Sequence, residues 1–307
     1  MRTLPGVLTA VTLAAASGIV LLIAAATIPV HAQSTRKTIY VTARGADGAP
    51  LAGLTAGDIV IRERGRVRPI IRVEPSRASL QVAVAVEERL APDDDVRRAV
   101  ANFFDHVYQA GTVALYTVGK RSERRIDYTA EIVPFARAIN GLPPRSVEPG
   151  DIVQAVLEIA RDQRSREGRR AIVVLCTDGA QPSTVTVEGV LEQLRAGSSV
   201  LYAATLAGWN TSTIPAGSTS GGRKLDLEGQ ISGLDRDRMY TEGTRQSGGI
   251  HVSFQRTGGM FAALERIAEE LTRQFVVSYD ADPLSDGGIE VEAGRAGLTV
   301  RGPTRTK

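Results

Sequence analysis

The sequence predicts an α/β fold, in which an open, mostly parallel sheet carries helices on both faces. Near-continuous apolar runs at Leu80–Val86 and Ala171–Cys176 are typical of strands that are covered on both sides. Between them, apolar residues recur at helical spacing, as in the stripe Val96, Val100 and Phe103. Because such segments alternate along the chain, crossover helices between parallel strands are expected.

The strands of this sheet are predicted from apolar runs and from alternation. At 125–133, polar and apolar side chains alternate, which favours an edge strand. The run at 275–279 is expected to be the last strand of the sheet. In chain order, the expected strands are 80–86, 112–118, 125–133, 171–176, 200–205, 250–254 and 275–279.

The helices are predicted from apolar stripes and end signals. Asp93–Asp95 supply a cap and favourable charge before the first stripe, and Gly197 ends the third helix. Residues 206–233 are rich in Gly, Ser and Thr and are expected to form a long mobile loop. The expected helical stripes run over 96–107, 152–160, 187–194 and 260–271.

Both ends of the chain have β character. Residues 37–77 contain short alternating strands linked by turns, which alone make too small a core for a domain. Two short strands, 289–292 and 298–301, follow near the end, and we expect them to pair with the N-terminal segment in a small β module. The predicted organisation is a signal peptide at 1–32, an N-terminal β segment at 37–77, the α/β domain at 78–280 and C-terminal strands at 281–307.

The N-terminal segment resembles an export signal. An apolar stretch, Val7–Val30, follows Arg2, and small residues in Val30-His31-Ala32 precede Gln33. This pattern predicts a cleaved secretory signal peptide, with an uncleaved membrane anchor as the alternative. In both cases the rest of the protein is exported, either periplasmic or secreted. It contacts the membrane only if the segment stays uncleaved.

Composition and motifs exclude several functions. A formal net charge of +3 gives no reason to expect a nucleic-acid partner. The single cysteine, Cys176, cannot form an internal disulfide, and its apolar run predicts a buried structural thiol. The sequence has no His-Glu-x-x-His pair, no Cys–His cluster and no phosphate-binding Gly-rich loop. The segment Gly217–Gly221 mimics a nucleophile elbow but carries Thr at its centre. We therefore expect no enzymatic activity.

Three features together resemble a known family. Gly53-Leu54-Thr55-Ala56-Gly57-Asp58-Ile59-Val60-Ile61 precedes the α/β core, and Thr177-Asp178-Gly179 ends its apolar strand. Towards the end stand, in order, Ser247-Gly248-Gly249-Ile250, Ile267-Ala268-Glu269-Glu270-Leu271, Gln274-Phe275-Val276-Val277-Ser278-Tyr279 and Gly297-Leu298-Thr299-Val300-Arg301. In this order, over roughly residues 38–301, they resemble the VWFA-related domain of exported bacterial proteins, a von Willebrand factor type A-like domain.

The resemblance implies a Rossmann-like fold and a role in adhesion, scaffolding or ligand recognition. In type A domains, a divalent cation often binds at the carboxyl ends of the strands, held by an Asp-x-Ser-x-Ser motif, a Thr and the Asp of Thr-Asp-Gly. Here Glu87-Glu88-Arg89-Leu90-Ala91 stands in place of the first motif, and Asp151 aligns with the Thr. Only Asp178 matches outright, so the adhesion site is degenerate.

The candidate ligand-binding residues are Glu87, Arg89, Asp151, Asp178 and Trp209. An arginine at a cation site tends to replace the charge of the ion, so we expect no metal cofactor and a pairing of Arg89 with Asp178. The alternative is a rebuilt metal site of Glu87, Asp151 and Asp178 that takes Mg²⁺ or Ca²⁺. Trp209, in the polar loop, is either a binding residue or packs on the sheet edge.

The sequence thus predicts a non-catalytic, exported binding or scaffold module of the cell envelope. Its expected partner is an envelope or extracellular protein, or another macromolecule, whose identity the residues leave open. One alternative is a cation-dependent adhesion module that uses the remaining acidic side chains. A hydrolase of unknown substrate is the last alternative.

Overall fold

The structure is a computed structural model that describes residues 35–91, 93–144, 146, 148–179, 183–208, 227–283 and 288–304. The predicted signal peptide, at residues 1–32, lies outside the described residues. Within the described residues, every helix is too short or too polar to span a membrane.

The central sheet contains six strands in the order β10-β9-β8-β5-β6-β7. Its strands are parallel except β7, which pairs antiparallel with β6 at one edge. The strand order reverses between β5 and β8, as in doubly wound folds. In chain order these strands are β5 Leu80–Glu87, β6 Gly111–Val118, β7 Ser122–Thr129, β8 Arg169–Thr177, β9 Ser199–Leu206 and β10 His251–Phe254.

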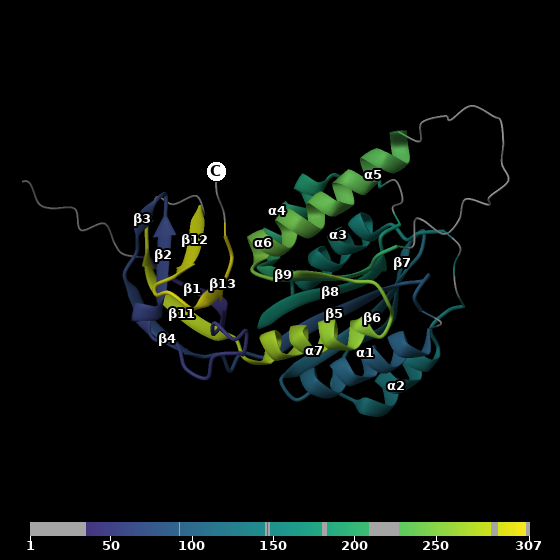
Figure 1. The fold of residues 1–307 in the computed structure, drawn as a ribbon, viewed down its shortest axis with the longest axis horizontal. Helices are drawn as coiled ribbons and strands as arrows, with labels where there is room; N and C mark the ends of the chain where they lie inside the picture. The colour runs from purple at the N-terminus through teal and green to yellow at the C-terminus, as the bar shows by residue number, and fades with distance from the viewer. Residues whose placement is uncertain are drawn as a thin grey trace, which may run out of the picture. The chain divides into compact units, whose positions relative to one another are not determined.

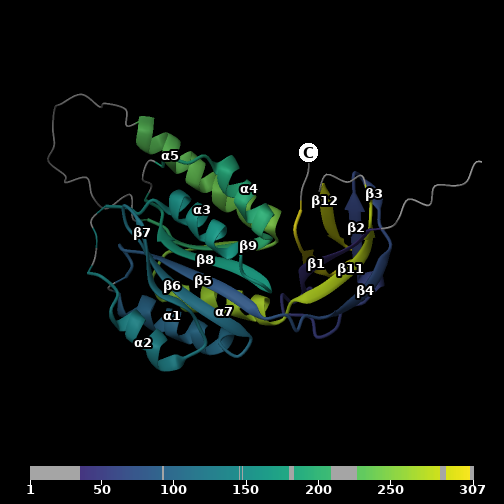
Figure 2. The same ribbon diagram turned by 180° about the vertical axis from the view of Figure 1, so that it is seen from behind.

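Helices cover both faces of this sheet, as Figures 1 and 2 show. On one face, α1, α2 and α7 bury Phe103, Phe135 and Leu264 against the strands. On the other, α3 and α4 bury Val156 and Leu191. The helices are α1 Asp94–Val107, α2 Ile132–Asn140, α3 Ile152–Gln163, α4 Val187–Gly197, α5 Leu227–Arg238, the π-helical turn η3 Met239–Gly243, α6 Thr244–Ser247 and α7 Gly259–Thr272. The predicted α/β fold class is therefore confirmed.

A small β module is built from both ends of the described chain, as predicted. Strands β12 and β13 pair antiparallel with β2 and β1, so purple and yellow strands lie side by side in Figure 1. The module contains β1 Thr35–Arg44, β2 Ile59–Glu63, β3 Arg66–Val67, β4 Ile70–Pro75, β11 Phe275–Ala281, β12 Ile289–Ala293 and β13 Thr299–Arg301, with a short 3-10 turn, η1, at Ala56–Asp58.

The prediction that residues 275–279 form the last strand of the central sheet was wrong. Strand β11 instead lies between β1 and β4 in a four-stranded sheet of the β module. Its side chains alternate between buried and half-buried, with Val277 and Tyr279 inside the module core. A strand of the central sheet such as β5 is buried at nearly every position, because helices cover both of its faces.

Two local predictions also need correction. The edge strand ends at Thr129, and residues from Ile132 form α2, a helix that the sequence did not predict. Pro134 in its first turn hid the helical pattern, although proline is tolerated there because those N–H groups have no partner inside the helix. The expected loop at 206–233 is interrupted at Leu227, where α5 begins.

Buried ion pairs join the β module to the last helix of the α/β domain. The carboxylate of Glu270, on α7, is almost fully buried and accepts a hydrogen bond from Arg44 Nε over 3.1 Å. Arg301 of β13 pairs with the same carboxylate. Truncating one member of such a buried pair would leave a charge without compensation.

Candidate functional site

The candidate site lies at the carboxyl edge of the sheet, which we define as the strand ends at Glu87, Thr177 and Leu206. Glu87 ends β5 and Thr177 ends the neighbouring strand β8, where the strand order reverses. In open α/β sheets, ligands bind beside this switch point.

Glu87 is 1% exposed, and its carboxylate holds two loops together. Its Oε2 accepts hydrogen bonds from the Thr177 backbone N–H over 2.6 Å and from Thr177 Oγ1 over 2.9 Å. Its Oε1 accepts one from the Gly150 N–H over 3.1 Å. Burial raises the pKa of Glu87, while these donors oppose that rise by stabilising the charged form. The side chain is therefore a structural brace between β5, β8 and the loop before α3.

Gly150 lets that loop come close to the strands. A Cβ at this position would lie 2.5 Å from the backbone oxygen of Val118, so a larger residue would push the loop away. The next residue, Asp151, caps α3 by accepting a hydrogen bond from the Gln154 N–H over 3.0 Å. Burial raises the pKa of Asp151. Its carboxylate therefore serves the helix end, which is the use expected of an aspartate at that position.

Asp178 follows β8 and bonds to the loop after β9. Its Oδ2 accepts a hydrogen bond from the Gly208 N–H over 2.7 Å. Its own N–H donates to the Leu206 oxygen over 3.0 Å. The carboxylate thus holds two neighbouring strand ends together at the carboxyl edge.

Two arginines lie against the loop at 178–179. Arg236, from α5, is 7% exposed, and its Nη1 donates to the backbone oxygen of Asp178 over 2.5 Å and to that of Gly179. Arg89 approaches the same loop so closely that a Cβ on Gly179 would clash with Arg89 Nη1. Arg89 Nε also lies 4.0 Å from Oε1 of Glu87. Two guanidinium groups therefore stand where the carboxyl ends of the strands converge.

These residues do not fit a divalent cation. A cation such as Mg²⁺ or Ca²⁺ needs several free oxygen ligands. Here the oxygens of Glu87 accept backbone and hydroxyl donors, Asp151 caps a helix and Asp178 accepts from Gly208. Within the part of the chain that the structure describes, no group of three or more acidic, histidine or cysteine side chains could hold a metal. The carboxyl edge is organised by hydrogen bonds between protein groups.

Two predictions about this site are not tested by the structure. Trp209 lies outside the described residues, so its role stays a prediction. The pairing of Arg89 with Asp178 also stays a prediction.

The sequence analysis did not identify Arg236 as a site residue. It follows a Gly- and Ser-rich stretch without an apolar stripe, and only the fold brings α5 to the carboxyl edge.

Two potentially reactive side chains near this edge, Cys176 and His251, contact hydroxyl groups of the fold. Cys176 is fully buried, its Sγ lies 2.8 Å from the Tyr240 hydroxyl, and burial raises the pKa of its thiol to about 12. This agrees with the predicted structural thiol. His251 Nε2 lies 3.0 Å from Oγ1 of Thr205, a hydroxyl on a buried residue, and burial lowers the pKa of His251. Cys176 is thus enclosed in the fold, whereas His251 is an exposed residue whose imidazole contacts Thr205.

The strand order and the antiparallel edge strand define a von Willebrand factor type A-like fold. No protein-family model and no curated protein sequence matches the chain. Among solved structures, BatB, a conserved hypothetical protein from Bacteroides thetaiotaomicron, is 18% identical with a TM-score of 0.46, over 63% of this chain and 99% of that one.

Two further structures illustrate the range of similar proteins. Proximal thread matrix protein 1 from the mussel byssus, with a zinc-occupied MIDAS motif, is 13% identical with a TM-score of 0.47, over 69% of this chain and 50% of that one. The SpRpn10 VWA domain is 12% identical with a TM-score of 0.41, over 59% of this chain and 93% of that one.

Proposed function

We propose that this protein is a non-catalytic binding or scaffold module that works without a divalent cation. One observation carries the proposal: Glu87, Asp151 and Asp178 each accept hydrogen bonds from protein donors, and Arg89 and Arg236 supply positive charge at the carboxyl edge. Guanidinium groups, unlike an ion, cannot dissociate, so the loops at this edge keep their arrangement at any metal concentration.

A titration with divalent cations tests whether the protein binds a metal ion. Isothermal titration of Mg²⁺, Mn²⁺ and Ca²⁺ into the purified protein should show no binding tighter than about 1 mM, because the carboxylate oxygens at the carboxyl edge already accept hydrogen bonds from protein groups. Asp178→Ala and Asp105→Ala, which removes an exposed carboxylate on α1, serve as matched variants. Submillimolar binding that Asp178→Ala abolishes and Asp105→Ala preserves would establish a cation-dependent adhesion module instead.

We further propose that the partner is an envelope or extracellular macromolecule. The N-terminal segment at 1–32 supports export, since it has the pattern of a cleaved signal peptide. N-terminal sequencing of the protein from its host should then give Gln33, with the protein soluble outside the cytoplasm. Full-length protein found only in membranes would favour the anchor.

Partner capture provides the functional test. The protein should retain a partner from an envelope extract equally well in buffer with millimolar Ca²⁺ and Mg²⁺ and in buffer with a chelator. If the chelator releases the partner from this protein, and from Asp105→Ala as well, binding depends on a cation and the proposal is wrong.

A further inference from the structure

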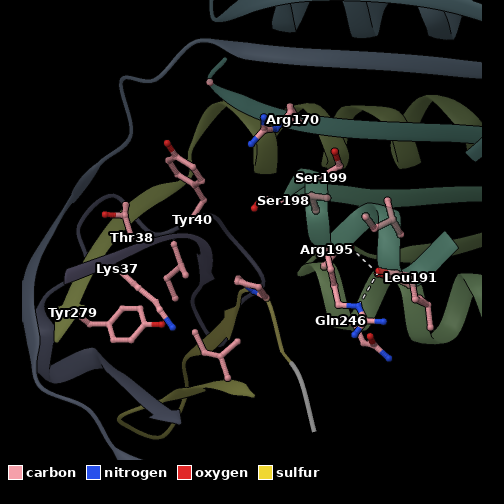
Figure 3. Close-up of a pocket in the computed structure, with 18 of the residues that line it drawn as sticks. Lys37, Thr38, Tyr40, Arg170, Leu191, Arg195, Ser198, Ser199, Gln246 and Tyr279 are labelled. Carbon is pink, nitrogen blue, oxygen red and sulfur yellow. Dashed lines mark hydrogen bonds between the residues drawn. The ribbon is translucent and has the colours of Figure 1, made fainter. Parts of the chain in front are cut away.

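A cavity of about 460 Å³ lies at the opposite edge of the same sheet. We define this amino edge as the starts of β8 and β9, at Arg170 and Ser199. The cavity is lined by residues of α4, the end of α6 and β1 of the β module, among others, as Figure 3 shows. Its volume is in the range of pockets that hold small molecules. It shares no residue with the carboxyl edge, so a ligand here would be independent of the proposed function.

Much of the cavity wall is apolar. The α/β side contributes aliphatic side chains from α4 and β9, and the β module contributes aliphatic side chains and two tyrosine rings. These residues are Ile39, Tyr40, Leu191, Leu194, Val200, Tyr279 and Ile289. Such a wall favours a ligand with an apolar body, because contact between the two removes apolar surface from water.

The charged residues that line the cavity are mostly cationic. They are Lys37, Arg170, Arg195 and a single acid, Glu63. The carboxylate of Glu63 is already engaged, because it accepts hydrogen bonds from Lys37 Nζ over 3.3 Å and from the Tyr279 hydroxyl over 3.0 Å. Lys37 and Glu63 therefore offset each other, which leaves the charges of two arginines.

Arg170 and Arg195 have no carboxylate partner among the described residues. Arg170 Nη1 donates to the backbone oxygen of Arg166 over 2.6 Å, and Arg195 Nε donates to that of Leu191 over 3.0 Å. Arg170 Nε is buried and has no hydrogen-bond partner in the described part of the chain. Planar guanidinium groups with spare donors recognise carboxylate and phosphate, the anions whose oxygens match their geometry.

A buried hydroxyl lies on the strand next to that of Arg170. Ser199 is 2% exposed, lines the cavity, and its Oγ lacks a hydrogen-bond partner among the described residues. Arg170 and Ser199 are Cα partners in the β8–β9 register. In a parallel pair, partner residues project to the same face of the sheet, here the face that α4 covers. An unpaired buried donor is costly, so a ligand oxygen at this point would be stabilised.

We propose that this cavity binds a small amphipathic anion, a molecule with one carboxylate or phosphate group and an apolar body. The anionic group lies at Arg170 and Ser199, with Arg195 adding positive potential, and the body packs on the apolar wall between α4 and β1 (Figure 3). The ligand bridges the two parts of the chain that form the cavity, so its binding also stabilises their packing.

The test is isothermal titration of the purified protein with octanoate, octyl phosphate, 1-octanol and inorganic phosphate. At least one of the two amphipathic anions should bind with one-to-one stoichiometry, and the tighter one identifies the head group. Octanol lacks the charge and inorganic phosphate lacks the body, so each should bind at least roughly ten-fold more weakly. Binding of octanol as tight as that of both anions, or binding of neither anion, would overturn the proposal.

Variants locate the site. Arg170→Gln and Arg195→Gln should each weaken anion binding roughly ten-fold, because a charge-assisted hydrogen bond or a nearby positive charge is lost. Arg98→Gln, which removes an exposed arginine on α1, is the matched control and should bind as the wild type does. Arg195 is exposed, so its variant should fold even if Arg170→Gln does not. If Arg195→Gln and Arg98→Gln bind alike, the cavity is not the anion site.

Discussion

The two edges of the central sheet both carry arginines, and they use them differently. At the carboxyl edge, Arg236 donates to the backbone oxygens of a loop, and the carboxylates of Glu87 and Asp178 accept hydrogen bonds from protein groups. At the amino edge, Arg170 and Arg195 have no carboxylate partner among the described residues and line a cavity. The difference shows that a cation satisfied by fixed acceptors organises the fold, whereas one with spare donors beside a cavity is suited to a ligand.

The largest effect is expected at Glu87. Glu87→Ala removes the acceptor of the Gly150 and Thr177 donors and leaves them buried without partners, so we expect a loss of about 3–5 kcal/mol of unfolding free energy. Urea unfolding of the two proteins measures it. A loss below about 1 kcal/mol would mean that the carboxyl edge is not braced by this side chain.

The comparison of the edges is tested most directly with one arginine from each. Arg236→Gln should lower the unfolding free energy by about 1.5–3 kcal/mol, because it removes hydrogen bonds from a charged donor to buried carbonyls. Arg195→Gln should change it by less than about 0.5 kcal/mol, as is usual for exposed positions. Thermal unfolding measures both changes. Equal losses of unfolding free energy in Arg236→Gln and Arg195→Gln would contradict the proposal that one edge is structural and the other binds a ligand.

A double-mutant cycle tests how closely Arg89 approaches the loop at 178–179. Gly179→Ala should cost about 1 kcal/mol, because the new Cβ would force the end of the Arg89 side chain to shift. Arg89→Ser should itself cost about 1–3 kcal/mol through loss of its buried contacts. In the double variant the steric part of the Gly179→Ala cost should disappear, so the two losses should not add. Strict additivity would place the Arg89 guanidinium away from this loop.

The smallest expected effect is a dependence of the unfolding free energy on pH. Burial raises the pKa of Glu87 above its usual 4.5, so the folded state keeps this proton to a higher pH than the unfolded state does. The resulting stabilisation is complete below the unfolded value and is lost as pH rises through the folded one. The stability of the wild type relative to Glu87→Gln should therefore fall as pH rises above 4.5. A relative stability that increases over this range would reverse the sign of the pKa shift.

Most of the α/β fold could be predicted from local patterns. The buried strands β5 and β8 carry unbroken apolar runs, and α1 carries a clean stripe after a capping aspartate. These signals are local because burial on both faces, or on one helical face, acts directly on residue spacing. The pattern was weaker at α2 and α5, where Pro134 and a Gly- and Ser-rich stretch obscured it.

The sequence by itself determined the alternation of strands and helices, the joining of both ends in a β module, and the position of Glu87 and Asp178 at the ends of buried strands. Only the tertiary structure decided that β11 joins the β module, that Arg236 reaches the carboxyl edge and that Arg170 and Arg195 line one cavity. The physical reason is the distance along the chain over which each kind of interaction acts. Propensity and apolar period act over a few residues, whereas strand partners and hydrogen-bond acceptors come from segments that only the folded chain brings together.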